Sequence, residues 1–208
     1  MVVPSPPRPP ARPVQPLSKD SLRSAALDAR KAFARTLGDA GRTILEERLA
    51  EHLTGICASA RVVAGYAAFG SEISPLLAME EARSVGAIVA FPAFGNPAKP
   101  FQFRAGDPTV PGPFGIMQPA PTAPVVEPDL VLVPLIAVDP HGARIGRGKG
   151  HYDRVLARMK RSGVRLVGVG WRMQRLDDTF PADPWDVRLD AFASPEGIEW
   201  FNRSARTH

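Results

Sequence analysis

The sequence predicts an α/β fold, built as a three-layer sandwich with a mostly parallel central sheet and helices on both faces. Residues 130–138 form a continuous apolar run, which is typical of a strand buried on both faces. A helical pattern and a second strand pattern, at 164–169, follow this run. The order strand, helix, strand indicates a crossover unit between two parallel strands, and therefore a largely parallel sheet.

The N-terminal half predicts helices followed by alternating short elements. Ser18 can cap a first helix, in which apolar residues recur at helical spacing from Leu22 to Phe33. Asp39 can cap a second helix, and His52 falls on its apolar face, which predicts a histidine in the core or at its boundary. The next predicted elements are a strand over 61–68, a helix over 75–83 and a strand over 87–91.

The middle of the chain predicts a loop-rich insertion. Residues 92–128 carry many Pro and Gly residues, with one strand-like patch at 101–104. Long loops in compact domains are often functional, so this insertion is a candidate wall of a binding site. After the apolar run, a helix is predicted through Tyr152 and Met159 and ends at Gly163.

Length and composition fit one globular domain. The chain has 208 residues, of which 44% are hydrophobic and 23% charged, so it can bury a sizeable core. Cys57 is the only cysteine, which rules out a disulfide within the chain and fits a reducing, cytoplasmic compartment. No apolar run approaches the roughly 18 residues of a membrane-spanning helix.

Residues 1–17 differ from the rest of the chain. They hold seven of the 23 prolines and two arginines, and they lack the apolar core of a signal peptide. This composition predicts a disordered, dispensable leader before a domain over 18–208, with a ligand for a proline-recognition domain as the alternative.

The net charge is modestly positive, at +5, and the leader holds two of these charges, which leaves +3 for the rest. A positive balance attracts anions. Nucleotides, polyglutamate tails, nucleic acid and acidic membranes are all candidates, and charge alone does not choose among them.

The main candidate site is the segment from Arg144 to Asp153, which connects the buried strand to its helix. Ligands of open α/β sheets bind where strands lead into helix N-termini, and such termini attract anions. Its glycines are Gly146, Gly148 and Gly150, and its cations are Arg144, Arg147 and Lys149. Glycines let the backbone approach a ligand. The segment therefore predicts a phosphate cradle, with a basic, solvated turn as the alternative.

Asp153 lies one turn into the predicted helix. A carboxylate there can hold Mg²⁺ through one or two oxygens while phosphates supply the remaining ligands. The alternative is simple pairing with the helix N-terminus. The spacing of the cradle matches neither G-x-x-x-x-G-K-[ST] nor G-x-G-x-x-G, so the residues alone do not identify the nucleotide-binding family.

The cradle resembles the signature of 5-formyltetrahydrofolate cyclo-ligases, also called methenyltetrahydrofolate synthetases. Leu132-Val133-Pro134, Asp139 and Gly142 precede it as in that family, and the similarity extends over nearly all of 18–193. Weaker matches stand in the family's order: Lys19-x-x-Leu22-Arg23, Ser71-Glu72-Ile73, Gly115-Ile116-Met117-Gln118-Pro119, and Gln174 with Pro181, Asp186 and Asp190.

The resemblance implies conversion of ATP and 5-formyltetrahydrofolate into 5,10-methenyltetrahydrofolate, ADP and phosphate, through a phosphorylated formyl group and with Mg²⁺. It implies catalytic roles for Lys149 and Arg147, and Mg²⁺ ligation by Asp153 and Asp186. The residues it implies for ATP are Lys19, Arg23, Arg144, Gly146, Arg147, Gly148, Lys149, Gly150 and Tyr152. Those it implies for the folate, with or without a polyglutamate tail, are Phe69, Glu72, Phe114 and Tyr152. A monomer is expected, with no membrane or nucleic-acid partner.

Three residues depart from the family's usual pattern. His151 stands where a tyrosine is usual, Trp185 where a histidine is common, and Ala93 where a basic residue is frequent. None of the three is a phosphate or metal residue. Taken without the resemblance, four site residues also have ordinary explanations: Arg23 as a solvated helix charge, Glu72 as an acid at a helix start, Phe114 as a loop anchor and Asp186 as a loop acid.

The alternative function is a nucleic-acid-binding or regulatory protein that keeps this fold without turnover. The basic charge favours it slightly. Two features argue against it: the part after the leader carries only +3, and no stretch interleaves basic with aromatic residues as RNA-binding surfaces do. What discriminates is the retention of five residues together, because a non-catalytic descendant need not keep them all: Lys19, Arg23, Lys149, Asp153 and Asp186.

Overall fold

The computed structural model describes residues 18–95, 100–148, 151–181, 183 and 186–201. The predicted leader, Lys149, Gly150 and Trp185 lie outside these residues, as do the side chains of Phe114 and His151. The helices are α1 (Lys19–Ala58), α2 (Leu76–Ser84) and α3 (His151–Arg161), with the short 3₁₀ turns η1 (Pro113–Gly115) and η2 (Arg172–Gln174).

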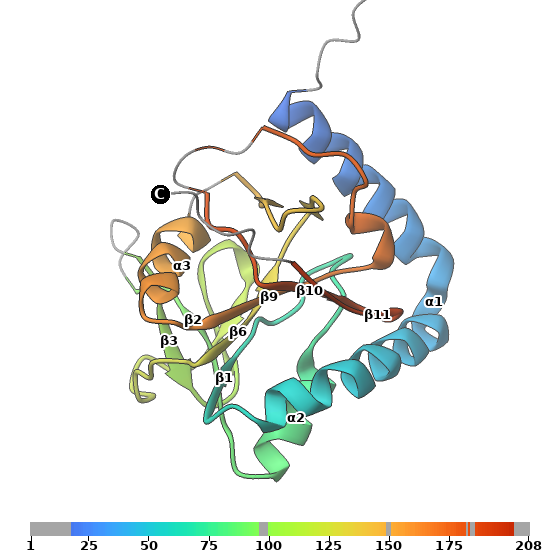
Figure 1. The fold of residues 1–208 in the computed structure, drawn as a ribbon. Helices are drawn as coiled ribbons and strands as arrows, with labels where there is room; N and C mark the ends of the chain where they lie inside the picture. The colour runs from blue at the N-terminus through green and yellow to red at the C-terminus, as the bar shows by residue number, and fades with distance from the viewer. Residues whose placement is uncertain (1–17, 96–99, 149–150, 182, 184–185, 202–208) are drawn as a thin grey trace, which may run out of the picture.

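A seven-stranded sheet forms the centre of the molecule (Figure 1). Its strands, in spatial order, are β11 (Gly197–Trp200), β10 (Ala191–Ser194), β9 (Arg165–Val169), β6 (Leu130–Pro134), β1 (Val62–Ala64), β2 (Ile88–Ala93) and β3 (Gln102–Ala105). The five inner strands run parallel, and the two edge strands are antiparallel to their neighbours. Two small ribbons join β4 (Val110–Pro111) to β5 (Met117–Gln118), and β7 (Ala137–Val138) to β8 (Arg144–Ile145).

Helices cover both faces of this sheet: α1 and α2 lie on one side and α3 on the other (Figure 1). The alternation of side chains along β6 shows why. Leu130 and Leu132 pack in the cluster that contains the buried side chains of α1 and α2. Val131 and Val133 pack in the cluster that contains those of α3. The predicted three-layer α/β architecture is therefore confirmed.

The two predicted N-terminal helices are the two halves of α1. The Ser18 side chain accepts a hydrogen bond from the Ser21 N–H, as expected of a cap. Gly38 breaks the helix with a φ of 60° and a ψ of 179°, a conformation that glycine adopts without steric cost. Asp39 thus begins the second half, as predicted. Of the described residues, none belongs to a helix that is both long and apolar enough to cross a membrane.

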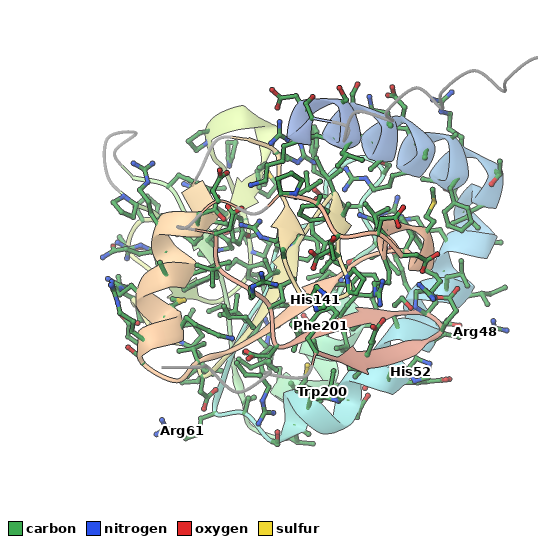
Figure 2. All side chains as sticks on the ribbon, turned by 45° about the horizontal axis from the view of Figure 1, so that its top comes forward. Arg48, His52, Arg61, His141, Trp200 and Phe201 are labelled. Atoms are coloured by element: carbon green, nitrogen blue, oxygen red, sulfur yellow. The ribbon has the colours of Figure 1, made fainter. Side chains whose placement is uncertain are left out.

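His52 is exposed, so its predicted place at the core or its boundary is wrong. Figure 2 shows Arg48 and His52 on the outer side of α1. The buried stripe runs through Leu49, Leu53 and Cys57. Each residue turns a helix by about 100°, so His52 lies about that far from Leu53 and faces solvent.

The apolar run 130–138 is not one strand. β6 ends at Pro134, and Ala137 and Val138 pair with β8 in a separate ribbon. Between them, the Leu135 carbonyl accepts hydrogen bonds from the Arg30 and Gln174 side chains rather than from a neighbouring strand. The chain therefore leaves the sheet here. The predicted strand over 61–68 is also shorter, because it ends at Ala64.

Candidate active site

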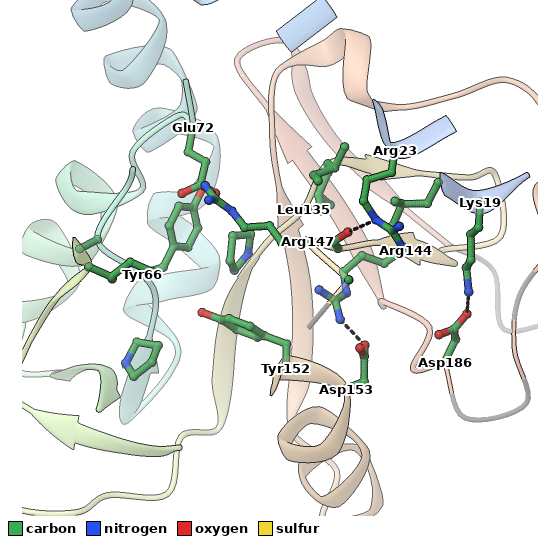
Figure 3. Close-up of a pocket in the computed structure, with 18 of the residues that line it drawn as sticks. Lys19, Arg23, Tyr66, Glu72, Leu135, Arg144, Arg147, Tyr152, Asp153 and Asp186 are labelled. Carbon is green, nitrogen blue, oxygen red and sulfur yellow. Dashed lines mark hydrogen bonds and ion pairs between the residues drawn. The ribbon is translucent and has the colours of Figure 1, made fainter. Parts of the chain in front are cut away.

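A cavity of about 350 Å³ opens at the carboxyl edge of the parallel strands. Its walls come from the residues that follow β1, β2 and β6, from the loop before α3, and from the N-terminal turns of α1 and α3. Sheets of this type bind ligands at this edge. Figure 3 shows Tyr66 and Glu72 on one side, Lys19 and Asp186 on the opposite side, and Arg144, Arg147 and Asp153 between them.

The phosphate cradle predicted at 144–153 forms part of this cavity. Gly146 and Gly148 line it, and Gly148 has a φ of +82°, which favours glycine. A Cβ on Gly146 would lie 3.0 Å from the Arg144 guanidinium, and one on Gly148 would lie 3.4 Å from that of Arg23. Glycine at these positions therefore keeps open the space between the backbone and two cations.

Arg23 connects α1 to the cradle. Its Nε donates to the Gly146 carbonyl at 2.9 Å, and its side chain is partly exposed to the cavity. An ion pair with Asp20 on the same helix orients it further. The cation predicted from the Lys19-x-x-Leu22-Arg23 pattern is thus brought to the cradle from more than 100 residues away in the chain.

Each acid that was predicted for the site forms an ion pair with a cation that also lines the cavity. Glu72 accepts a hydrogen bond from Arg147 at 2.7 Å, and Asp153 pairs with Arg144. Asp186 pairs with Lys19. These three pairs balance the charge of the cavity wall without a ligand. They also place cations and carboxylates side by side, as an anion and a metal ion bound together would require.

Lys19 has a second partner in Asp183, at 2.7 Å. Burial alone would lower the pKa of Lys19, but its hydrogen bonds to the Asp183 and Asp186 carboxylates outweigh burial and raise it. Lys19 therefore stays charged over the whole physiological range. Its positive charge lies beside the carboxylates at the side of the cavity opposite Glu72 (Figure 3).

Arg144 is buried, and its Nε has no hydrogen-bond acceptor among the described residues. Its guanidinium carbon lies 5.8 Å from the centre of the Tyr152 ring. A buried donor without an acceptor is costly, and a phosphate oxygen is a suitable acceptor for a guanidinium. A phosphate oxygen bound at the cradle would supply such an acceptor.

Two tyrosines give the cavity a wall of aromatic surface. The Tyr152 ring packs edge-on against Phe101, with centroids 5.0 Å apart, and Tyr66 is buried. Burial, and then the neighbouring Glu72 carboxylate, raise the pKa of both phenols. Both therefore stay neutral at physiological pH, and they supply packing surface rather than a proton acceptor.

The loop before α2 places Glu72 at the cavity. Its Oε2 accepts the Phe69 N–H at 3.0 Å, and its Oε1 faces both Arg147 and Arg30. Phe69 is exposed, and the Arg147 guanidinium lies 5.5 Å from the centre of its ring. Phe69 is thus beside the cavity rather than one of its lining residues, whereas Ile116 and Met117 do line it.

The sequence of this chain matches the model of the 5-formyltetrahydrofolate cyclo-ligase family over residues 16–195. The chain belongs to this family. A 5-formyltetrahydrofolate cyclo-ligase from Mycolicibacterium smegmatis is 34% identical over 194 residues, which cover 88% of this chain and 96% of that protein. One from Escherichia coli is 36% identical over 73 residues, or 35% of this chain and 40% of that protein.

Solved structures of the cyclo-ligase family share the fold. A 5,10-methenyltetrahydrofolate synthetase from Aquifex aeolicus superposes with a TM-score of 0.75 at 26% identity, covering 92% of this chain and 96% of that one. One from Mycoplasma pneumoniae superposes with a TM-score of 0.68 at 22% identity, covering 86% and 99%. The predictions of the family, the fold and a cyclo-ligase enzyme are therefore confirmed.

Most of the predicted site residues meet in the cavity. Those that line it are Lys19, Arg23, Glu72, Arg144, Gly146, Arg147, Gly148, Tyr152, Asp153 and Asp186. Phe69 lies beside the cavity, and Phe114 belongs to η1 with its side chain outside the described residues. Lys149 and Gly150 lie outside the described residues, so the roles that the resemblance implies for them remain predictions.

Two charged residues of the site were missed. Asp183 lines the cavity beside Lys19, and nothing in its surroundings in the sequence singles it out. Arg30 is buried under Glu72, and here a signal was present. It lies four residues after Ala26 and three before Phe33, on the predicted apolar face. A charge on a buried stripe needs a partner, which is a reason to look for an acid.

Proposed function

We propose that this chain converts 5-formyltetrahydrofolate and ATP into 5,10-methenyltetrahydrofolate, ADP and phosphate, with Mg²⁺. The observation that carries the proposal is that one cavity is lined by Gly146, Gly148, Arg144, Arg147 and Glu72 together. A nucleotide at the cradle and a folate against Glu72 would then lie next to each other in the same cavity.

The chemistry needs both substrates in one place. The formyl group of 5-formyltetrahydrofolate is an amide, and its nitrogen donates electrons into the carbonyl, so the carbon is a poor electrophile. Transfer of the terminal phosphoryl group of ATP to the formyl oxygen makes that oxygen a leaving group. N10 of the folate then attacks the carbon, the C–O bond breaks, phosphate leaves, and the N10 proton passes to the departing phosphate or to water. Alignment and charge stabilisation are the protein's main contributions.

The cations of the cradle suit the phosphoryl-transfer step. Arg23, Arg144 and Arg147 can each offer a fork of donors to phosphate oxygens, and the resemblance adds Lys149. Arg144 already has a buried donor without an acceptor among the described residues. Developing charge on the transferred group would meet fixed cations here, and such stabilisation is a large term in enzymatic catalysis.

Asp153 and Asp186 fit a Mg²⁺ ion that arrives with the nucleotide. Both line the cavity, and carboxylate oxygens are ligands that Mg²⁺ prefers. Within the described part of the chain, no three His, Cys, Asp or Glu side chains gather as a metal site. The two aspartates would therefore share the ion with phosphates and water. Bound there, Mg²⁺ would neutralise phosphate charge, while Lys19 and Arg144 exchange their carboxylates for phosphate oxygens.

Absorbance in the long-wavelength band of the methenyl product tests this proposal. We expect the band to appear when the full-length protein receives 5-formyltetrahydrofolate, ATP and Mg²⁺, and to be absent when ATP is left out. Chelation of Mg²⁺ should stop the reaction. A folded preparation that forms no product with all three present would contradict the proposed function.

A further inference from the structure

Arg30 and Arg144 are the two buried cations among the described residues, and only Arg144 belongs to the cradle. The Arg30 side chain is 2% exposed and extends from α1 beneath the loop that carries Glu72. Its Nε donates to the Ser71 hydroxyl at 3.0 Å, and one terminal nitrogen donates to the Leu135 carbonyl at 3.1 Å. A buried charge requires such partners.

The charge of Arg30 is directed at Glu72. Its terminal nitrogen lies 3.9 Å from Glu72 Oε1, which is too long for a hydrogen bond but within ion-pair distance. Both side chains are shielded from water, with exposed fractions of 2% and 10%. Because water screens poorly there, the attraction is much stronger than that of a surface pair at the same distance.

Other residues already hold the backbone of this loop. Arg42 donates to the Gly70 carbonyl at 3.0 Å and also to the Glu72 carbonyl. The Trp171 indole N–H donates to the Ser71 carbonyl at 2.9 Å. The loop backbone therefore has anchors besides Arg30. Beyond its hydrogen bond to Ser71, Arg30 adds a positive charge beneath the carboxylate.

Glu72 Oε1 also has a second cation, on the cavity side. Arg147 approaches it at 2.7 Å, and its side chain is 48% exposed (Figure 3). Arg147 belongs to the cradle, and in the proposed reaction it turns to the phosphates. Arg30 is enclosed and cannot leave with it. After that exchange, Arg30 is the cation that still compensates the charge of Glu72.

We propose that Arg30 is a positioning residue for folate binding: it holds the Glu72 carboxylate oriented toward the cavity once Arg147 has moved to the nucleotide. This inference rests on the proposed function, because it assigns Glu72 to the folate. It places the support for the folate side in α1, the same helix that supplies Lys19 and Arg23 to the nucleotide side.

Two substitutions separate the charge of Arg30 from its hydrogen bonds. Arg30→Gln keeps donors near Ser71 and Leu135 but removes the charge, whereas Arg30→Lys keeps the charge. We expect Arg30→Gln to raise the KM for 5-formyltetrahydrofolate at least about tenfold, since a buried carboxylate loses its partner, with the KM for ATP within about twofold of wild type. Arg30→Lys should recover most of the loss.

A double-substitution cycle with Glu72→Gln then tests the route of the effect. Without the carboxylate, Arg30→Gln should change the folate KM by less than about threefold, because coupled residues are not additive. Arg175→Leu is the matched control, since it removes an arginine that pairs with Glu199, at 2.6 Å, outside the cavity lining. It should lower the melting temperature and leave both KM values unchanged.

The outcomes separate this inference from the proposed function when direct binding of 5-formyltetrahydrofolate is measured beside turnover. If wild type turns over but Arg30→Gln keeps a normal folate KM, or shifts it equally in both backgrounds, the role of Arg30 is wrong and the function stands. If wild type binds the folate without turnover and Arg30→Gln weakens that binding, the proposed function is wrong and the role of Arg30 in folate binding stands. Failure of both Arg30 variants to fold would make Arg30 a folding residue and overturn the inference.

Discussion

The two sides of the cavity are built differently. On the cradle side, Arg147 and Gly148 are exposed, and Arg144 and Arg147 come from one short glycine-rich segment, to which α1 adds Arg23. On the Glu72 side, the carboxylate is buried, and its supports come from α1 and from the turn around Trp171. The nucleotide side is therefore encoded largely by one local segment, whereas the folate side depends mainly on contacts between distant segments. Variants on the two sides should therefore fail in different ways.

The largest effect is expected at the cradle, for Lys149→Ala. Loss of one charge-stabilising donor should lower turnover at least about 100-fold, while the free energy of unfolding should change by no more than about 0.5 kcal/mol for this glycine-flanked residue. Steady-state kinetics and thermal unfolding measure the two effects.

Lys31→Ala, at an exposed position of α1, is the control for Lys149→Ala and should leave turnover unchanged. Near-normal turnover of Lys149→Ala would show that this lysine does not stabilise the transferring phosphate. A small, salt-dependent loss of RNA binding with normal turnover would instead support the alternative of a nucleic-acid-binding protein.

Asp153→Asn should lower turnover about tenfold or more at a fixed Mg²⁺ concentration, because an amide is a weaker ligand for a hard cation than a carboxylate. Excess Mg²⁺ should restore part of the loss. A titration of turnover against Mg²⁺ measures this, with Asp28→Asn, at an exposed position of α1, as the control. A titration curve like that of wild type would show that Asp153 pairs with Arg144 and does not bind Mg²⁺.

The exchange of Arg147 between the two sides predicts a smaller, asymmetric effect. Arg147→Gln should lower kcat about tenfold through the loss of a phosphate donor, yet the KM for the folate should not rise, because Arg147 competes for Glu72 in the ligand-free state. A rise in the folate KM equal to that of Glu72→Gln would show that Arg147 binds the folate directly.

The smallest effect concerns Cys57, in the core far from this chemistry. Burial raises the pKa of its thiol from a usual value of 9.0 to about 12. Between pH 9.0 and about 12, the Cys57 thiol loses its proton in the unfolded chain but keeps it in the folded chain. The free energy of unfolding therefore falls as pH rises through this window, and Cys57 does not change it at lower pH. A thiol reagent at pH 8 should react with Cys57 only after unfolding. Rapid labelling of the native protein would contradict this burial.

The comparison of the two sides also explains how much the sequence could predict. The cradle was found because glycines and cations that act together stand within ten residues. Arg30 and Asp183 act through residues distant in the chain, and no local pattern pairs them with Glu72 or Lys19. The apolar run 130–138 likewise predicted one strand, because the side chains that redirect Leu135 and Ile136 come from Arg30 and Gln174. Local patterns thus predicted the layers, while long-range polar contacts decided where strands end.

The coupling between ATP use and ring closure is the most direct test of whether this cavity joins the two substrates. Full-length protein is mixed with 5-formyltetrahydrofolate and Mg²⁺, ATP is added, and the methenyl band is followed while ADP is quantified. We expect no methenyl band before ATP is added. After ATP is added, we expect one ADP for each methenyl product, and we expect Lys149→Ala to form neither. Product formation without ATP, or ATP hydrolysis without ring closure, would contradict the claim that this cavity joins the two substrates.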